Sequence, residues 1–263
     1  MKVRLILEYD GSFFSGWQSQ ANAHTVQSEL GRSLEVYLHS LAKREGIALE
    51  TLPKLTASGR TDAGVHALGQ VVSFEWPAEL PFDRSRCCAA LNGISSRGLG
   101  VLAAEECSDT FDARFSAHTK RYFYRILLRS HGGQGLYHGR VWHLDRRLDV
   151  AAMAAAAKHF RGTHDFSAFR AADCTAKTTV RTLEQSQLAR VDRNELRYFV
   201  QGTGFLKQMV RIIVGTLVEV GLGRLSAAEI PGVIASLERS SAGETAPACG
   251  LYLEWVRYTE PAA

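Results

Sequence analysis

The chain has 263 residues, of which 46% are apolar and 22% are charged, and its formal net charge is +4 at pH 7. These values fit one large globular domain or two smaller ones, and they exclude collagen, a coiled coil and a largely disordered chain. The longest unbroken apolar run, 150–157, is far shorter than the roughly 20 residues of a bilayer span, and early charges argue against a signal peptide, so we expect a cytoplasmic protein without a membrane segment.

The first half of the chain predicts a strand, a helix, two strands, a helix and a strand. Apolar residues alternate over 2–9, which is typical of a strand, and Asp10-Gly11-Ser12 ends it. Thr25 is a typical N-cap, and the helical spacing of the apolar residues after it predicts a helix over 26–43. The remaining predicted elements are strands over 47–57 and 69–76, a helix over 83–92 and a strand over 100–106. This β-α-β-β-α-β order is typical of a split βαβ domain.

The second half repeats that order less cleanly. It predicts a strand through Tyr122–Leu128, helices over 149–160 and 204–221, strands over 179–190 and 195–201, a helix opened by a capping box at Ser226, and a last strand over 250–258. The expected fold class is therefore α+β, with two ferredoxin-like domains over 1–110 and 111–263. No linker rich in proline or serine separates the halves, so we expect their mostly antiparallel sheets to merge and to leave a cleft between the domains.

The densest group of residues suited to chemistry is Ser58-Gly59-Arg60-Thr61-Asp62-Ala63-Gly64-Val65-His66-Ala67. Its two glycines allow turns and a close approach of a ligand to the backbone. In such a turn Arg60 could pair with Asp62 and hold it ionised, and an ionised, oriented carboxylate is what attack on an anomeric carbon requires. The alternative is a structural Asx turn with a surface ion pair.

No other segment competes as a catalytic site. The sequence has no nucleotide-binding glycine motif, no nucleophile elbow and no Cys/His spacing that suits zinc, so we expect neither a metal nor a cofactor. The five cysteines are expected to be free thiols.

Basic residues flank three aromatic residues in Lys120-Arg121-Tyr122-Phe123-Tyr124-Arg125. RNA-binding sheets use rings for stacking and cations for phosphate, although a half-buried strand would give the same pattern. Lys207 and Arg211 lie four residues apart on the predicted helix over 204–221, where a solvated helix face is the alternative. Arginine outnumbers lysine 24 to 7, which suits phosphate contact but also follows from codon composition.

Four motifs follow one another along the chain. They are 58–67, Phe111–Ala117 with Lys120-Arg121-Tyr122, Asp165–Phe169, and Phe205–Arg211 with Gly215-Thr216-Leu217. The segments Leu7–Gly11, Gly16-Trp17-Gln18 and Gly250–Leu253 extend the pattern to both ends. On these residues the chain resembles the TruA family of tRNA pseudouridine synthases over nearly its whole length.

The resemblance implies a role for each of five residues. Asp62 would be the nucleophilic aspartate, and Arg60 would contact the RNA beside the flipped nucleotide. Tyr122 would stack on the target uracil, Arg211 would pair with Asp62, and Leu251 would wall the uracil pocket. The family's fold has two ferredoxin-like domains that share an extended sheet, with the active site in the cleft between them. Whether the aspartate attacks C1′ or abstracts a sugar proton stays open.

The resemblance also implies the reaction and its partners. Members of the family isomerise uridine to pseudouridine at positions 38, 39 and 40 of the tRNA anticodon stem-loop, and they act as homodimers in which one tRNA touches both subunits. The reaction needs no cofactor, but the target base must leave the stack to reach a carboxylate. The expected protein is thus a cofactor-free cytoplasmic isomerase that binds tRNA.

The chain departs from the family pattern at a few positions. Gly93–Gly100 stands where many members have a Leu-Pro followed by an Asp-Ile, Asp112 stands where histidine is common, and Gln208 and Ile212 replace commoner residues beside Arg211. Two other function classes remain as alternatives, a catalytically silent RNA-binding module and a pseudouridine synthase with another site or RNA. A hydrolase with an aspartate nucleophile is a third, although nothing in the sequence marks its leaving-group acid.

Overall fold

The computed structural model describes residues 1–49, 51–129 and 135–259. They form two compact units. Unit 1 contains Met1–His118 and the chain from Leu253 onward, and unit 2 contains Thr119–Tyr252. The two units are defined by contacts between residues, which does not test how the chain divides into folding domains. The expected domains, 1–110 and 111–263, therefore stay a prediction.

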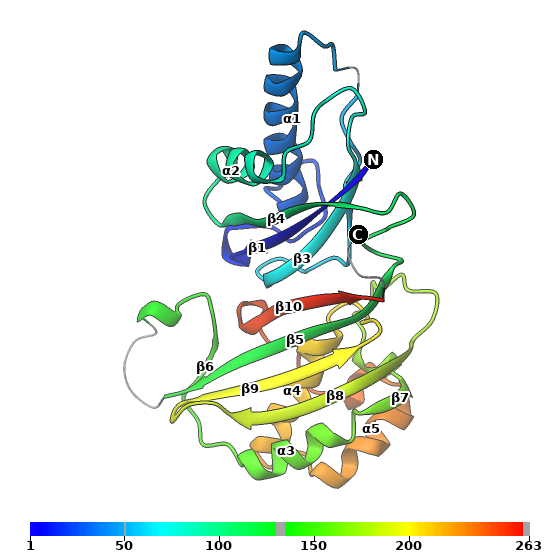
Figure 1. Cartoon of the computed structure of the whole chain (residues 1–263). Coiled ribbons are helices and arrows are strands. Elements are labelled where there is room, and N and C mark those ends of the chain that lie inside the picture. Colours follow the sequence, from blue (N-terminus) through cyan, green and yellow to red (C-terminus); the bar gives the residue numbers. More distant parts are fainter. Residues whose placement is uncertain (50, 130–134, 260–263) are drawn as a thin grey trace. The chain divides into compact units, whose positions relative to one another are not determined.

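Unit 1 has an antiparallel sheet with two helices on one of its faces (Figure 1). The strands β4 (Leu99–Cys107), β1 (Lys2–Tyr9) and β3 (His66–Glu75) are neighbours in that order, and β10 (Leu251–Tyr258) lies on the other side of β3. The two-residue strand β2 (Thr56–Ala57) also pairs with β3. The helices are α1 (Val26–Glu45) and α2 (Arg84–Ile94).

The alternation in β1 builds the core of unit 1. Val3, Leu5, Leu7 and Tyr9 share one face of the strand and are almost completely buried. Helix α1 begins where the sequence predicts, because the Thr25 hydroxyl accepts the Ser28 backbone N–H and completes a capping box.

The prediction of a strand over 47–57 is largely wrong. Residue 50 lies outside the described residues, and within the rest of that segment only Thr56–Ala57 forms a strand. Pro53 has no N–H to donate to a ladder, which fits the irregular backbone that precedes β2.

Unit 2 also has a sheet whose helices lie on one face (Figure 1). The strands β5 (Ala117–Leu128), β9 (Glu195–Gly202), β8 (Val180–Arg190) and β7 (Gly162–Asp165) are antiparallel neighbours in that order, and β6 (Trp142–Leu144) pairs in parallel with β5. The helices are α3 (Val150–Lys158), α4 (Met209–Gly221) and α5 (Ile230–Ser236).

Two features of unit 2 differ from the sequence prediction. Helix α4 begins at Met209 rather than near 204, because Gln208 has a left-handed backbone with φ of +61°. The short strands β6 and β7 were not predicted, since three and four residues are too few to show a recognisable period. The predicted α+β class with mostly antiparallel strands is confirmed, whereas the merging of the two sheets and the ferredoxin-like detail stay predictions.

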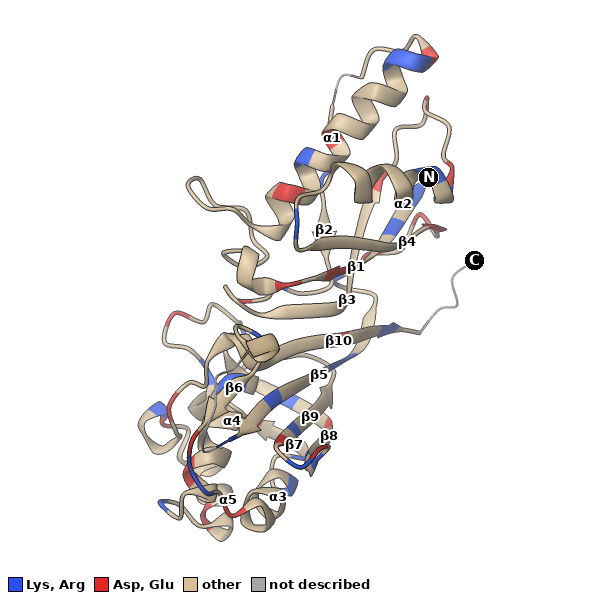
Figure 2. Ribbon diagram, turned by 90° about the vertical axis from the view of Figure 1, so that its left-hand side faces the viewer, with Lys and Arg blue, Asp and Glu red and all other residues tan. Residues whose placement is uncertain are grey.

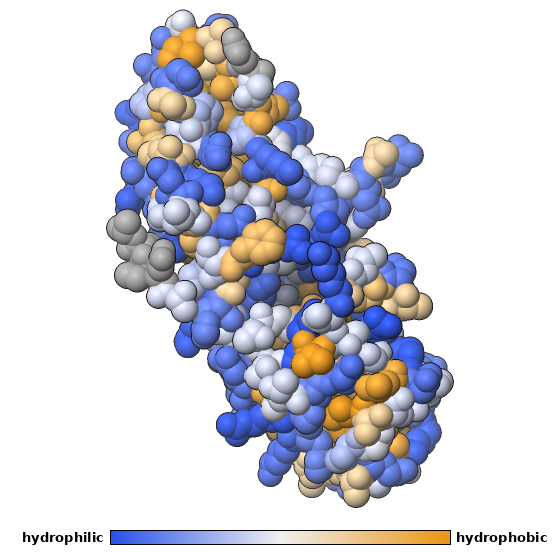
Figure 3. All heavy atoms as spheres, turned by 90° about the vertical axis from the view of Figure 1, so that its right-hand side faces the viewer, coloured by the Kyte–Doolittle hydropathy of each residue, from blue (hydrophilic) through white to orange (hydrophobic). Residues whose placement is uncertain are grey.

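Short 3₁₀ helices occur in both units. Their bounds are Gly11–Phe13 (η1), Gly135–Tyr137, Ser167–Phe169, Ala227–Glu229, Arg239–Ser241 and Ala248–Gly250. Across the described ranges no helix has the length and apolarity to cross a bilayer. Charged residues occur on both units, with Lys or Arg on β5 and β9 (Figure 2), and the face drawn in Figure 3 is mostly hydrophilic with small apolar groups between.

Candidate functional site

The Asp62 loop, residues 58–65, connects β2 to β3 and is anchored at its start by buried hydrogen bonds. The Ser58 backbone N–H donates to the Val71 carbonyl at 2.8 Å, and the Ser58 hydroxyl donates to Gln70 Oε1 at 2.6 Å. The amide group of Gln70 in turn donates to the Gly59 carbonyl at 2.9 Å. Strand β3 therefore fixes the first two residues of the loop.

A buried tyrosine from β1 holds the residue that precedes Asp62. The Tyr9 hydroxyl lies 2.8 Å from Thr61 Oγ1 and accepts from Gln70 Nε2 at 3.4 Å. Burial raises the pKa of Tyr9 to about 12, so the phenol stays neutral at physiological pH. Sequence reasoning missed both anchors, although Gln70 is a polar residue directly before the apolar pair Val71-Val72.

The segment 10–17 packs directly against the Asp62 loop. The Trp17 N–H donates to the Thr61 carbonyl at 3.0 Å, and the Gly64 N–H donates to the Phe14 carbonyl at 3.4 Å. A Cβ atom at Gly11 would overlap the Val65 carbonyl, so only glycine allows this approach. The two segments are held together by their backbones.

His66 ties the end of the Asp62 loop to the start of this segment. The Asp10 carboxylate accepts from the Ser12 N–H at 3.0 Å and lies 3.2 Å from His66 Nδ1. The same His66 nitrogen accepts from the Gly11 N–H at 3.0 Å. His66 is thus a structural histidine that orders the backbone on both sides.

Asp62 is half-buried, whereas Arg60 is exposed. No ion pair within the described ranges joins Arg60 to a carboxylate, so the structure shows no pairing of Arg60 with Asp62 across a turn. The Arg60 guanidinium instead faces solvent, which leaves its donors available to a polyanion.

In unit 2, Tyr122 lies on β5 with its ring edge-to-face against Phe205, at a centroid distance of 5.0 Å and an angle of 75°. This contact brings the second and fourth sequence motifs together. The next two rings of the strand are packed inside the unit. Phe123 stacks on Tyr252 at 4.8 Å, and the Tyr124 hydroxyl donates to the Pro247 carbonyl at 2.7 Å. For these two rings the half-buried strand is the correct interpretation.

Arg211 lies in the first turn of α4 and is held by Ala246. Its Nε donates to the Ala246 carbonyl at 2.8 Å, and the Ala246 N–H donates to the Arg211 carbonyl at 3.2 Å. Lys207 precedes the helix and forms an ion pair with Asp173 at 2.5 Å. Leu251, at the start of β10, is only 6% exposed.

The five predicted site residues fall in both units. Arg60 and Asp62 belong to unit 1, whereas Tyr122, Arg211 and Leu251 belong to unit 2. Their convergence on one site stays a prediction.

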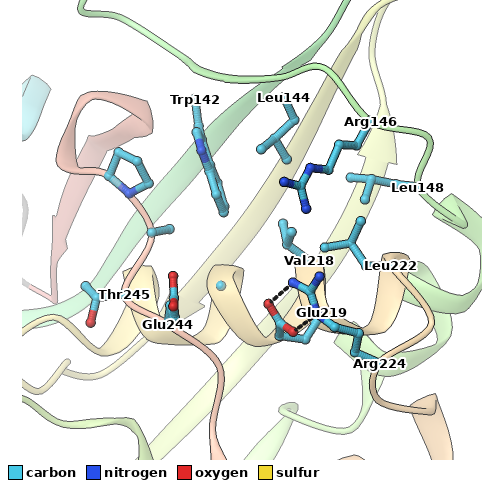
Figure 4. A pocket seen from close by; sticks show the side chains of 13 residues that line it. Trp142, Leu144, Arg146, Leu148, Val218, Glu219, Leu222, Arg224, Glu244 and Thr245 are labelled. Atoms are coloured by element: carbon cyan, nitrogen blue, oxygen red, sulfur yellow. Dashed lines mark hydrogen bonds and ion pairs between the residues drawn. The ribbon is translucent and has the colours of Figure 1, made fainter.

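A pocket of about 400 Å³ lies in unit 2 between β6, α4 and residues 244–247 (Figure 4). Trp142, Leu144 and Val218 give it apolar walls, and Arg224 pairs with Glu219 at its rim. None of the five predicted site residues lines this pocket. Ala246, which does line it, accepts a hydrogen bond from Arg211 through its carbonyl. In the described part of the chain no group of three or more His, Cys, Asp or Glu side chains could hold a metal ion.

These features define a mixed α/β protein with one strongly anchored aspartate loop. Residues 156–259 match the family model described as tRNA pseudouridine synthase. The tRNA pseudouridine synthase A of Acetivibrio thermocellus is 44% identical over 97% of this chain and 99% of its own. That of Myxococcus xanthus is 42% identical over 98% of this chain and 92% of its own. That of Caulobacter vibrioides is 38% identical over 98% of both chains. The chain belongs to the tRNA pseudouridine synthase family.

A solved structure of a Cbf5-Nop10-Gar1 complex aligns with a TM-score of 0.36 and 12% identity, over 81% of this chain and 46% of that chain. That likeness is too low to bear on the fold or the function.

Proposed function

We propose that this protein isomerises uridine to pseudouridine in tRNA, at positions 38, 39 and 40 of the anticodon stem-loop, with Asp62 as the nucleophile. The observation that supports this most is the family membership, since relatives named tRNA pseudouridine synthase A align over nearly the whole chain. The anchored loop around Asp62 adds a physical reason to place the reacting carboxylate there.

The reaction exchanges one bond for another without a net change in composition. The bond between N1 of uracil and C1′ of the ribose breaks, and a bond between C5 and C1′ forms. The proton on C5 is released, and N1 takes up a proton. A carboxylate that is held in one orientation lowers the entropic part of such a barrier, which is the purpose we assign to the hydrogen bonds of Ser58, Thr61 and Gln70.

The other four residues have supporting roles in this proposal. Arg60 contacts the RNA beside the extruded nucleotide, and Tyr122 stacks on the uracil. Arg211 pairs with Asp62, and Leu251 forms a wall of the uracil pocket. The protein acts in the cytoplasm as a homodimer that binds tRNA.

Tritium release tests the reaction directly. The substrate is an unmodified tRNA transcript labelled at uridine C5, incubated with the wild type and with Asp62→Ala. Release by the wild type alone supports both the reaction and the nucleophile. A wild type that folds and binds tRNA but releases no tritium would point to another RNA substrate or to a binding module without catalysis.

A further inference from the structure

Arg97 lies on the turn 95–98 between α2 and β4, inside the segment where the sequence departs from its family pattern. Its guanidinium carbon is 5.5 Å from the centroid of the Phe13 ring, which is a cation–π distance. Arg97 is exposed, and Phe13 is 43% exposed. Both members of this pair therefore belong to the surface of unit 1.

The turn that carries Arg97 is held in place on both sides. The Ser96 N–H donates to Glu29 Oε1 on α1 at 2.7 Å, and the Gly98 carbonyl accepts from the Asp10 N–H at 2.9 Å. Gly98 has φ of +98°, and a Cβ atom there would come within 2.6 Å of the Phe13 ring. Glycine at this position is what lets Phe13 lie under Arg97.

Phe13 in turn belongs to the segment that packs on the Asp62 loop. It ends η1, which Asp10 caps, and the next residue, Phe14, accepts the Gly64 N–H. The chain of contacts therefore runs from Arg97 through Phe13 to the backbone of the proposed catalytic loop, entirely within unit 1.

Within the described residues Arg97, like Arg60 and Arg84, has no acidic partner, whereas some other arginines of unit 1 do. Arg4 pairs with Glu105, and Arg32 pairs with Glu29. No carboxylate within the described residues forms an ion pair with Arg97. A guanidinium that lies over a ring keeps its N–H donors available, and the contact favours some of its rotamers, so less entropy is lost when it binds an anion.

From this geometry we infer that Arg97, positioned by Phe13, binds a phosphodiester of the RNA substrate near the target nucleotide. The inference rests on the proposed function for the identity of the RNA. The contact adds affinity and fixes the RNA backbone, and it takes no part in the bond changes at the uridine. Arg97 is thus a binding residue and Phe13 a positioning residue.

Equilibrium binding to the unmodified tRNA transcript tests the contact. The full-length protein carries Asp62→Ala in every case, so that no turnover occurs, and binding is measured at several salt concentrations. Arg97→Ala should weaken binding by about five- to tenfold and reduce the slope of log affinity against log salt by about 1, as for one lost phosphate contact. Arg97→Lys should restore most of the slope but only part of the affinity, because a lysine keeps the charge without the fork. Phe13→Leu should weaken binding less than Arg97→Ala, with the slope nearly unchanged.

Arg84→Ala is the matched control, because Arg84 is an exposed arginine of α2 in the same unit that forms no ring contact in the described structure. Equal losses and equal slopes for Arg97→Ala and Arg84→Ala would overturn the inference, as would a thermal unfolding shift in Arg97→Ala with unchanged binding. Failure of the proposed reaction can be told apart from failure of this inference. If the wild type binds tRNA but releases no tritium, the salt slopes of the Arg97 and Arg84 variants can still be compared. A wild type that does not bind tRNA would refute both.

Discussion

The hydroxyl groups of Tyr9 and Thr61 lie 2.8 Å apart in the interior of unit 1 and join the first strand of the chain to the residue before Asp62. Both side chains are more than 90% buried, so neither can exchange this partner for water. The position of the proposed nucleophile therefore depends on a neutral phenol more than 50 residues away in the sequence.

Replacing Tyr9 with Phe should lower both the stability of the protein and its turnover. The change leaves the Thr61 hydroxyl without its partner, and we expect the free energy of unfolding to fall by about 1–2 kcal/mol. Turnover should fall more than the KM for tRNA rises, because the loop around Asp62 becomes less ordered. Tyr37→Phe is the control, since the Tyr37 hydroxyl forms no hydrogen bond in the described structure. Equal effects of the two variants on turnover would argue against an anchoring role.

Asp62→Asn should abolish tritium release while tRNA affinity stays within several-fold of the wild type. The amide has nearly the shape of the carboxylate but lacks the charge that a nucleophile needs. Asp145→Asn, at an exposed carboxylate of unit 2, should leave the rate unchanged. Normal turnover in Asp62→Asn would remove Asp62 from the mechanism.

Arg211→Ala should lower turnover by about 100-fold, because the proposal pairs the positive charge of Arg211 with Asp62 and this is the size of effect that loss of one electrostatic contact gives. Single-turnover rates on labelled tRNA measure this. The control is Arg224→Ala, which breaks an exposed pair with Glu219 and should leave the rate unaffected. An unchanged rate in Arg211→Ala would mean that Arg211 does not act on Asp62.

The ion pairs of Glu195 should make the folded protein less stable in acid. Burial tends to raise the pKa of this carboxyl, but hydrogen bonds from Arg125 and Arg197 outweigh burial, so the pKa is lowered. Its ion pairs therefore contribute fully above the unfolded-state pKa of about 4.5. That contribution is lost as the pH falls through the lower folded-state pKa. Glu195→Gln should cost about 2 kcal/mol at pH 7 by chemical denaturation, and the gap to the wild type should shrink as the pH falls below the unfolded-state pKa of about 4.5. A gap that does not change with pH would refute this assignment.

Two helical glycines should respond to alanine with opposite signs. At Gly215 of α4 a Cβ atom would overlap the Glu244 carbonyl, so Gly215→Ala must displace the segment that holds Arg211 through Ala246. We expect a loss of about 2–3 kcal/mol in the free energy of unfolding, together with lower turnover. At Gly31 of α1 nothing lies within 4 Å of such an atom, and Gly31→Ala should stabilise by about 0.5–1 kcal/mol. Thermal unfolding of both variants decides the matter.

Periodicity and capping predict β1 and α1 almost to the residue, because burial of one face and the Thr25 cap are local properties of the sequence. The strands β6 and β7 could not be predicted in this way. Strand β6 has three residues and β7 has four. They form strands only by pairing with the longer strands β5 and β8, respectively.

The Asp62 loop was recognisable from its motif, but its anchors were not. Gln70 and Tyr9 meet because β1 and β3 pair in the register that places Leu7 opposite Gln70, and a register is a property of the assembled sheet. Likewise, the pairing of Arg97 with Phe13 needs the α2–β4 turn to lie beside η1, two segments that are far apart in the sequence.

The last strand has a consequence for synthesis of the chain. Leu253 and the residues after it belong to unit 1, where Tyr258 donates to the Ala113 carbonyl and packs its ring on Phe111. At about 5–20 residues per second, the roughly 135 residues after His118 take on the order of ten seconds to translate. For that time β3 and the ring of Phe111 lack these partners, so we expect unit 1 to complete its fold only after Leu253–Tyr258 has left the ribosome.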